Sequence, residues 1–185
     1  ARFALDLDLT RPTIVEDGVT VAVEDARNLG LTKAAVDPVQ PVSYALGEHS
    51  LEGLPSGEQV AVVTGANSGG KTTLLETVCQ VALLAAMGLP VPAEVAEVGR
   101  FDAIVFHRRH ASFNAGVLEA TLKSVVPPLT ADGRTLMLVD EFEAITEPGS
   151  ASSLLHGLVT LTVDQGALGA FVTHLAADLE PLPDA

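Results

Sequence analysis

Residues 60–87 carry the pattern that most constrains the fold, because an apolar run, a glycine-rich turn and a long helical stretch follow directly on one another. The turn matches G-x-x-x-x-G-K-[ST] at Gly65, Gly70, Lys71 and Thr72. A loop of this kind lets backbone N–H groups converge on a phosphate, and the positive end of the helix dipole adds to the attraction. The predicted nucleotide-binding residues are Gly65, Ala66, Asn67, Ser68, Gly69, Gly70, Lys71, Thr72 and Thr73.

A second apolar run, residues 135–139, ends on an adjacent pair of acids about 70 residues after the loop. We predict that Asp140 holds Mg²⁺ together with the hydroxyl of Thr72, and that Lys71 reaches the β- and γ-phosphates. Glu141 is the candidate general base that orients and deprotonates the attacking water. An acid pair that merely caps a surface loop is the alternative, and the preceding phosphate loop makes it the weaker one.

His174 follows the last apolar run, residues 170–173. A histidine at that place is suited to sense the γ-phosphate or to hold the attacking water. An ordinary histidine at the end of a strand is the other interpretation of the same residue.

Strand and helix patterns alternate along the chain, which predicts an α/β fold with a largely parallel sheet. The predicted strands are residues 3–9, 13–23, 42–46, 59–64, 103–106, 135–139 and 170–173. The predicted helices are residues 71–87, 117–126 and 152–163, with Pro127-Pro128 ending the second of them. We expect residues 1–58 to be an N-terminal β-rich part and residues 59–185 a P-loop core, within one domain of a longer protein.

The net charge is −14, from 24 acids and 10 bases. No basic stripe indicates a main contact with nucleic acid, and the acidic, lysine-poor composition is typical of proteins from salt-loving organisms, where salt screens the self-repulsion. No apolar run is long enough to span a membrane. The single cysteine, Cys79, fits a cytoplasmic location.

Together these residues resemble the ATPase domain of the MutS family of DNA mismatch-repair and related proteins. The family's loop reads TGPNMGGKST, and the same asparagine and double glycine stand here at Asn67, Gly69 and Gly70. Further matches follow in the family's order: Asp102–Arg109 with D-x-I-F-T-R-I-G, Ser112-Phe113 with the signature S-T-F…E, Asp140-Glu141 with D-E, residues 143–152 with a glycine-rich loop, and Thr173-His174 with T-H. Ala144 and Ser150 replace glycines usual in the repair proteins, which indicates a divergent member.

The resemblance implies a P-loop NTPase fold of ABC-ATPase type, with a mostly parallel central sheet flanked by helices and an N-terminal antiparallel β portion. It implies an ATPase that uses ATP and Mg²⁺, with Asn67 near the γ-phosphate and Ser112 reaching the nucleotide of the partner in a homodimer. DNA would be contacted by regions outside this chain. Two alternatives remain open: another ABC-type ATPase of DNA maintenance, and a module that binds nucleotide only to control dimerisation.

Overall fold

The computed structural model describes residues 7–34, 38–65, 70–108, 115–145 and 148–179. The chain is an α/β protein that divides into two compact units. One comprises residues 1–58 and 73–101, and the other comprises residues 59–72 and 102–185. Each unit is described by itself below.

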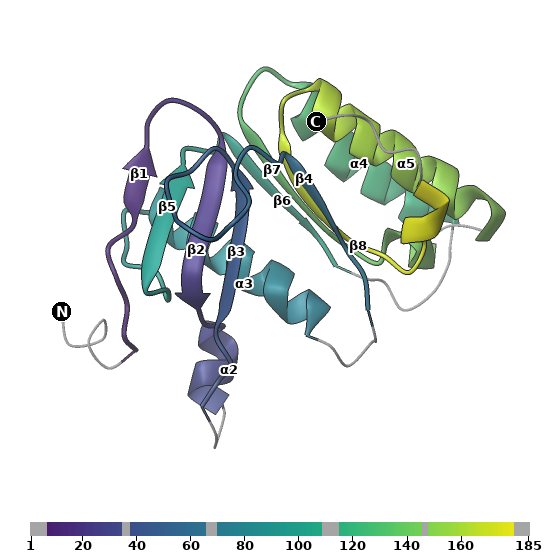
Figure 1. Cartoon of the computed structure of the whole chain (residues 1–185). Coiled ribbons are helices and arrows are strands. Elements are labelled where there is room, and N and C mark those ends of the chain that lie inside the picture. The colour runs from purple at the N-terminus through teal and green to yellow at the C-terminus, as the bar shows by residue number, and fades with distance from the viewer. Residues whose placement is uncertain (1–6, 35–37, 66–69, 109–114, 146–147, 180–185) are drawn as a thin grey trace. The chain divides into compact units, whose positions relative to one another are not determined.

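The first unit is built on a mixed sheet with the strand order β1-β5-β2-β3 (Figure 1). Its strands are β1 (Thr13–Val15), β2 (Thr20–Ala26), β3 (Val42–Gly47) and β5 (Val95–Gly99), and its helices are α2 (Leu29–Ala34) and α3 (Lys71–Ala86), whose first two residues group with the second unit. Strand β2 runs antiparallel to β3 and β5, whereas β1 is parallel to β5. Val81 and Ala85 of α3 join Val23 and Val98 of the strands in one buried cluster, so the helix closes the core of this unit.

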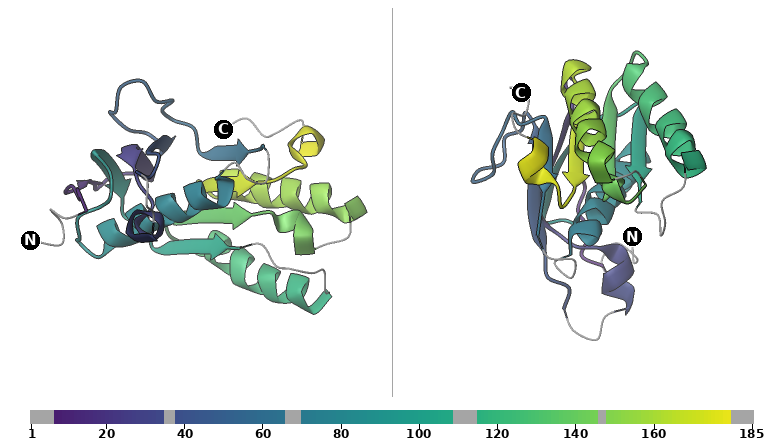
Figure 2. Two further views of the ribbon diagram at one scale, coloured as in Figure 1. Left: turned by 90° about the horizontal axis from the view of Figure 1, so that it is seen from below. Right: turned by 90° about the vertical axis from the view of Figure 1, so that its right-hand side faces the viewer.

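The second unit is built on a four-stranded sheet in which every neighbouring pair is parallel, in the order β4-β8-β7-β6. Its elements are β4 (Val60–Val63), β6 (Ala103–His107), α4 (Ala115–Thr130), β7 (Thr135–Asp140), the 3₁₀ helix η1 (Phe142–Ile145), α5 (Pro148–Asp164), β8 (Leu168–Val172) and the 3₁₀ helix η2 (Ala176–Leu179). Helices α4 and α5 lie side by side along this sheet, as the views of Figures 1 and 2 agree.

A single buried cluster joins α4 and α5 to this sheet. Val125 and Leu129 of α4 and Leu155 of α5 pack with Met137 of β7 and Phe171 of β8. All six residues of β7 and all five of β8 are buried. Strands buried along their whole length read as continuous apolar runs, which is why residues 135–139 and 170–173 were recognisable as strands in the sequence.

The strands and helices of the second unit confirm the sequence-based assignments, with one correction. The prediction that Pro127-Pro128 would end the second helix was wrong, because α4 continues to Thr130. The two prolines lie in the last turn, where each removes one i→i−4 hydrogen bond, and only two helical residues follow them. Leu129 beyond them is almost fully buried, so its packing stabilises the extra turn.

The first unit was less predictable. Strand β5 and helix α2 were not foreseen, and Leu7 and Leu9 lie outside the strands although they continue the predicted alternation. Thr10 makes only an isolated antiparallel bridge to Val91. Residues 1–6, the rest of that predicted strand, lie outside the described residues.

Helix α3 forms where the sequence predicts it and ends before Gly88, whose φ of +70° is left-handed. Gly88 N–H donates to Ala85 and Leu89 N–H to Leu84, a pairing that satisfies the last carbonyls of a helix. Met87, in the turn after the helix, is 70% exposed. No helix in the described part of the chain is long and apolar enough to cross a membrane.

Phe171→Ala should lower the free energy of unfolding by about 3–5 kcal/mol, because the ring of Phe171 is fully buried between the sheet and its helices. Urea denaturation followed by circular dichroism measures the change. Met87→Ala is the control at an exposed position, with an expected change within about 0.5 kcal/mol. Equal effects of the two substitutions would contradict this assignment of the core.

Candidate functional site

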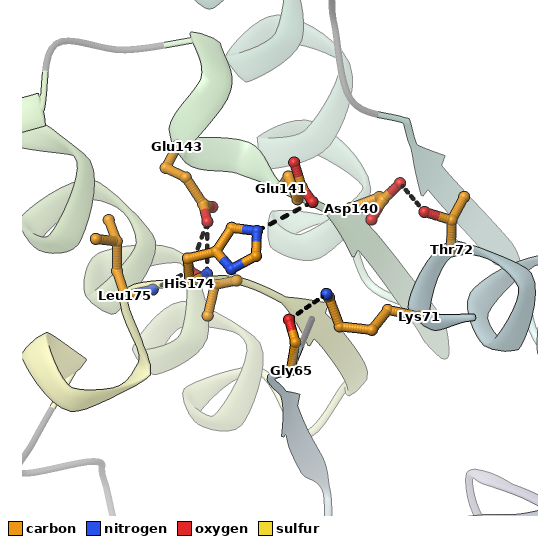
Figure 3. Close-up of polar contacts among 9 residues, drawn as sticks. Gly65, Lys71, Thr72, Asp140, Glu141, Glu143, His174 and Leu175 are labelled. Carbon is orange, nitrogen blue, oxygen red and sulfur yellow. Dashed lines mark hydrogen bonds and ion pairs between the residues drawn. The ribbon is translucent and has the colours of Figure 1, made fainter. Parts of the chain in front are cut away.

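The carboxyl ends of β4, β8 and β7 meet at one edge of the parallel sheet. Strand β8 lies between the other two, and its Val172 pairs in register with Val63 of β4 and with Asp140 of β7. The segments that follow these three strands therefore leave the sheet close together, and they carry Gly65, Glu141 and His174 (Figure 3). This edge is where open α/β sheets bind their ligands.

The loop after β4 contains glycines with backbone angles that other residues rarely adopt. Gly65 has a φ of +136° and Gly70 a φ of +78°. A Cβ atom added at either glycine would meet no described atom within 4 Å, so the backbone conformation, and not crowding, requires glycine there. The predicted binding residues Ala66, Asn67, Ser68 and Gly69 lie outside the described residues.

Lys71 is the first residue of α3 and is buried, with 7% of its surface exposed. Its Nζ donates a hydrogen bond to the carbonyl oxygen of Gly65 at 2.5 Å, so the ammonium group lies over the start of the loop. A buried ammonium group beside a helix N-terminus is a strongly attractive environment for an anion.

Thr72 and Asp140, the two residues predicted to hold Mg²⁺, are in direct contact. The Thr72 hydroxyl donates to Oδ2 of Asp140 at 2.8 Å (Figure 3). Asp140 is buried at the last position of β7. A hydroxyl and a carboxylate are hard oxygen donors, and Mg²⁺ is commonly held by one or two such protein ligands together with phosphates and water. This pair fits a magnesium ion bound beside the phosphate loop.

Glu141 has a φ of +46°, a left-handed conformation that is uncommon for any residue with a side chain. Its N–H donates to the carbonyl of Val172 at 2.9 Å, which continues the pairing of β7 with β8 by one residue. Left-handed backbone costs about 1–2 kcal/mol for a residue with a Cβ atom. Backbone strain of this kind is often found at functional sites, where contacts with the surrounding structure maintain it.

His174 lies against Glu141. Its Nε2 atom is 3.2 Å from Oε1 of Glu141, and the two side chains are 43% and 11% exposed. An ionised carboxylate only accepts hydrogen bonds, so the contact requires a proton on Nε2. The imidazole is thus open to a reactant on one side and tied to a carboxylate on the other.

Glu143 is a residue of this site that sequence reasoning missed. Its Oε1 accepts a hydrogen bond from the His174 N–H at 2.7 Å and one from the Thr173 hydroxyl at 3.0 Å. In the sequence Glu143 was only an acid two positions after the pair Asp140-Glu141 and the first residue of the segment matched to the family's glycine-rich loop, and neither signal gave it a role in the site.

Two other predicted residues stay predictions. Thr73 groups with the first compact unit, which is described by itself. Ser112 lies outside the described residues. The cluster in the described part of the second unit comprises Gly65, Gly70, Lys71, Thr72, Asp140, Glu141, Glu143, Thr173 and His174.

Comparison with known proteins gives a consistent set of relatives. The family model described as MutS domain V matches residues 61–177. The DNA-binding protein MutS2 of Pyrococcus furiosus is 41% identical over 176 residues, which cover 94% of this chain and 30% of that protein. Endonuclease MutS2 of Thermomicrobium roseum is 31% identical over 186 residues, which cover 94% of this chain and 22% of that protein.

A third relative is the DNA mismatch repair protein MutS of Salinibacter ruber, 33% identical over 184 residues, which cover 94% of this chain and 19% of that protein. The chain thus spans less than a third of the length of each of these relatives. The matched residues 61–177 include the phosphate loop, the acid pair and His174.

The left-handed backbone of Glu141 predicts that Glu141→Gly is more stable than Glu141→Ala by about 1 kcal/mol, because only glycine adopts this conformation without strain. Both variants lose the carboxylate, so their difference reports the backbone alone. Parallel urea denaturation curves measure it. An alanine variant as stable as the glycine variant would show that the position carries no strain.

Proposed function

The chain belongs to the MutS family, whose domain V it matches, and on that premise we propose that it binds ATP with Mg²⁺ and hydrolyses the nucleotide. Proteins of this family are ATPases that use Mg²⁺. One observation carries the proposal for this chain: the pair of Thr72 with Asp140 and the pair of Glu141 with His174 lie at the same sheet edge as Lys71. A P-loop NTPase fold of ABC-ATPase type accommodates this arrangement.

Binding rests on complementary charge. The Lys71 ammonium and the backbone N–H groups of the loop receive the phosphates, and a triphosphate would replace the Gly65 carbonyl as the partner of Lys71. Thr72 and Asp140 would hold the metal. When bound there, Mg²⁺ would supply positive charge beside the phosphate oxygens. Asn67, which matches the asparagine of the family's loop, is proposed to contact the γ-phosphate.

Hydrolysis needs a water molecule aligned with the γ-phosphate. Glu141 accepts a proton from that water, and His174 orients the water or the γ-phosphate. The contact of His174 Nε2 with Glu141 Oε1 supports this division, because it places a hydrogen-bond donor beside the carboxylate that serves as base. The activation free energy of hydrolysis is lowered because the water and the γ-phosphate are positioned and the developing negative charge is stabilised, as in phosphoryl transfer generally.

The biological process is proposed from the relatives. Their names include a DNA mismatch repair protein, a DNA-binding protein and endonucleases. We propose a role in DNA mismatch repair or recombination, in the cytoplasm, in which a homodimer forms through the nucleotide sites and Ser112 of one copy completes the site of the other. DNA would be held by other parts of the protein, since a net charge of −14 opposes binding to phosphates here.

The net charge of −14 also suits activity at high salt concentration. Repulsion among surface carboxylates falls as the Debye length shortens, from about 10 Å at 0.1 M salt to about 3 Å at 1 M. A chain with 24 acids and 10 bases therefore gains stability from salt, as a protein from a halophile would.

Lys71→Ala should weaken ATP binding by roughly tenfold to a hundredfold, because a charge-assisted hydrogen bond contributes about 1.5–3 kcal/mol. Titration with a fluorescent ATP analogue measures the dissociation constant. Lys123→Ala is the matched control, since Lys123 is exposed on α4 and pairs only with a neighbouring turn of the same helix among the described residues. Unchanged affinity in Lys71→Ala would refute the assignment of the loop.

Glu141→Gln should retain ATP binding and reduce kcat by about 10²- to 10⁴-fold, because glutamine keeps the shape of the side chain but accepts no proton. Phosphate release at saturating ATP and Mg²⁺ measures kcat, and Asp164→Asn, at the exposed end of α5, is the control. Undiminished hydrolysis would remove Glu141 from the role of base. Background turnover in the unsubstituted protein, with ATP bound, would favour a module that binds nucleotide without hydrolysing it.

A further inference from the structure

We propose that Glu143 is a positioning residue, which fixes His174 against Glu141 and so sets the rate of hydrolysis without contacting the nucleotide. The inference rests on the proposed function, because it assigns Glu143 a task in that same site. Neither the phosphate loop nor the acid pair requires this residue. Its carboxylate nevertheless lies where the segments after β7 and β8 meet (Figure 3).

The Glu143 carboxylate binds two consecutive residues through one oxygen, and a third residue is bound through Thr173. Oε1 accepts the backbone N–H of His174 at 2.7 Å and the hydroxyl of Thr173 at 3.0 Å. The Thr173 oxygen in turn accepts the N–H of Leu175 at 2.9 Å. Bonds to an ionised acceptor are stronger than neutral ones, so this set determines how the chain turns as it leaves β8.

Main-chain pairing of the sheet reaches Thr173, whose N–H donates to the carbonyl of Val63 at 3.2 Å, but among the described residues it does not extend to His174. Between the segments after β7 and β8, the last described main-chain bond joins Glu141 N–H to the Val172 carbonyl. Beyond it, η1 and the residues after β8 diverge from the sheet, and Glu143 supplies the next link between them. Phe142, the first residue of η1, is fully buried in the core, which holds the segment carrying Glu143 in place. Glu143 therefore binds His174 from a fixed position.

A double-mutant cycle in the full chain tests the proposal. Glu143→Ala should lower kcat for ATP by about tenfold to a hundredfold, because a small misplacement of His174 misaligns the water. The dissociation constant for ATP should stay within about twofold, since Lys71 and Thr72 are untouched. In the His174→Ala background, Glu143→Ala should cause no further loss, because the residue that it positions is absent.

Two conservative variants separate positioning from folding. Glu143→Gln keeps one oxygen that accepts both hydrogen bonds, so it should retain most of the turnover. Thr173→Val removes only one of the two donors to Oε1, and it should give a smaller loss of kcat that also vanishes without His174. Thr173→Val provides the test if the Glu143→Ala variant fails to fold. Asp164→Ala is the control for loss of an acid on the exposed surface of the same unit.

The outcomes are distinguishable. Equal losses of kcat with and without His174, or full activity in both Glu143→Ala and Thr173→Val, would overturn the positioning role and leave the proposed function intact. Full turnover in His174→Ala alone would contradict the role of His174 in the proposed function, and the inference about Glu143 would fall with it.

Discussion

The parallel register of β4, β8 and β7 is the constraint on which the site depends. Val172 of β8 is level with Val63 on one side and with Asp140 on the other, so three chain segments leave the sheet together. A shift of one residue in β7 would turn the Asp140 side chain to the opposite face of the sheet. The main-chain bond from Glu141 to Val172 extends this register by one residue. The burial of the apolar strands fixes their register. The register in turn determines which residues stand at the edge of the sheet and form the site.

That edge carries features that cost stability. Glu141 is held in a left-handed conformation, and Lys71 and Asp140 are buried. Each of these features is unfavourable alone. The core that supports them is continuous, since Phe142 and Phe171 are fully buried beside the same segments. A rigid core of this kind is what allows charged groups to be kept close together before any ligand binds.

The sequence predicted those parts that follow from local chemistry. The four strands of the parallel sheet were recognisable as short apolar runs, and the contact of Thr72 with Asp140 followed from the loop and the acid pair. Contacts that depend on packing were not recognisable. Leu129 carries α4 past two prolines because it is buried, and Glu143 matters because η1 turns it toward Thr173 and His174. In the first unit, strand β5 was missed because its short run, Val95–Gly99, includes the polar Glu97 and alternates only weakly.

The central claim is that this sheet edge turns over ATP with the help of Mg²⁺. The most direct test is the release of inorganic phosphate from ATP by the full chain, followed while Mg²⁺ is titrated and then removed with EDTA, at chain concentrations high enough for association. We expect release that rises with Mg²⁺ to saturation, stops on chelation and resumes when Mg²⁺ is restored. Release that never exceeds the rate in buffer, or that is indifferent to Mg²⁺, would contradict it.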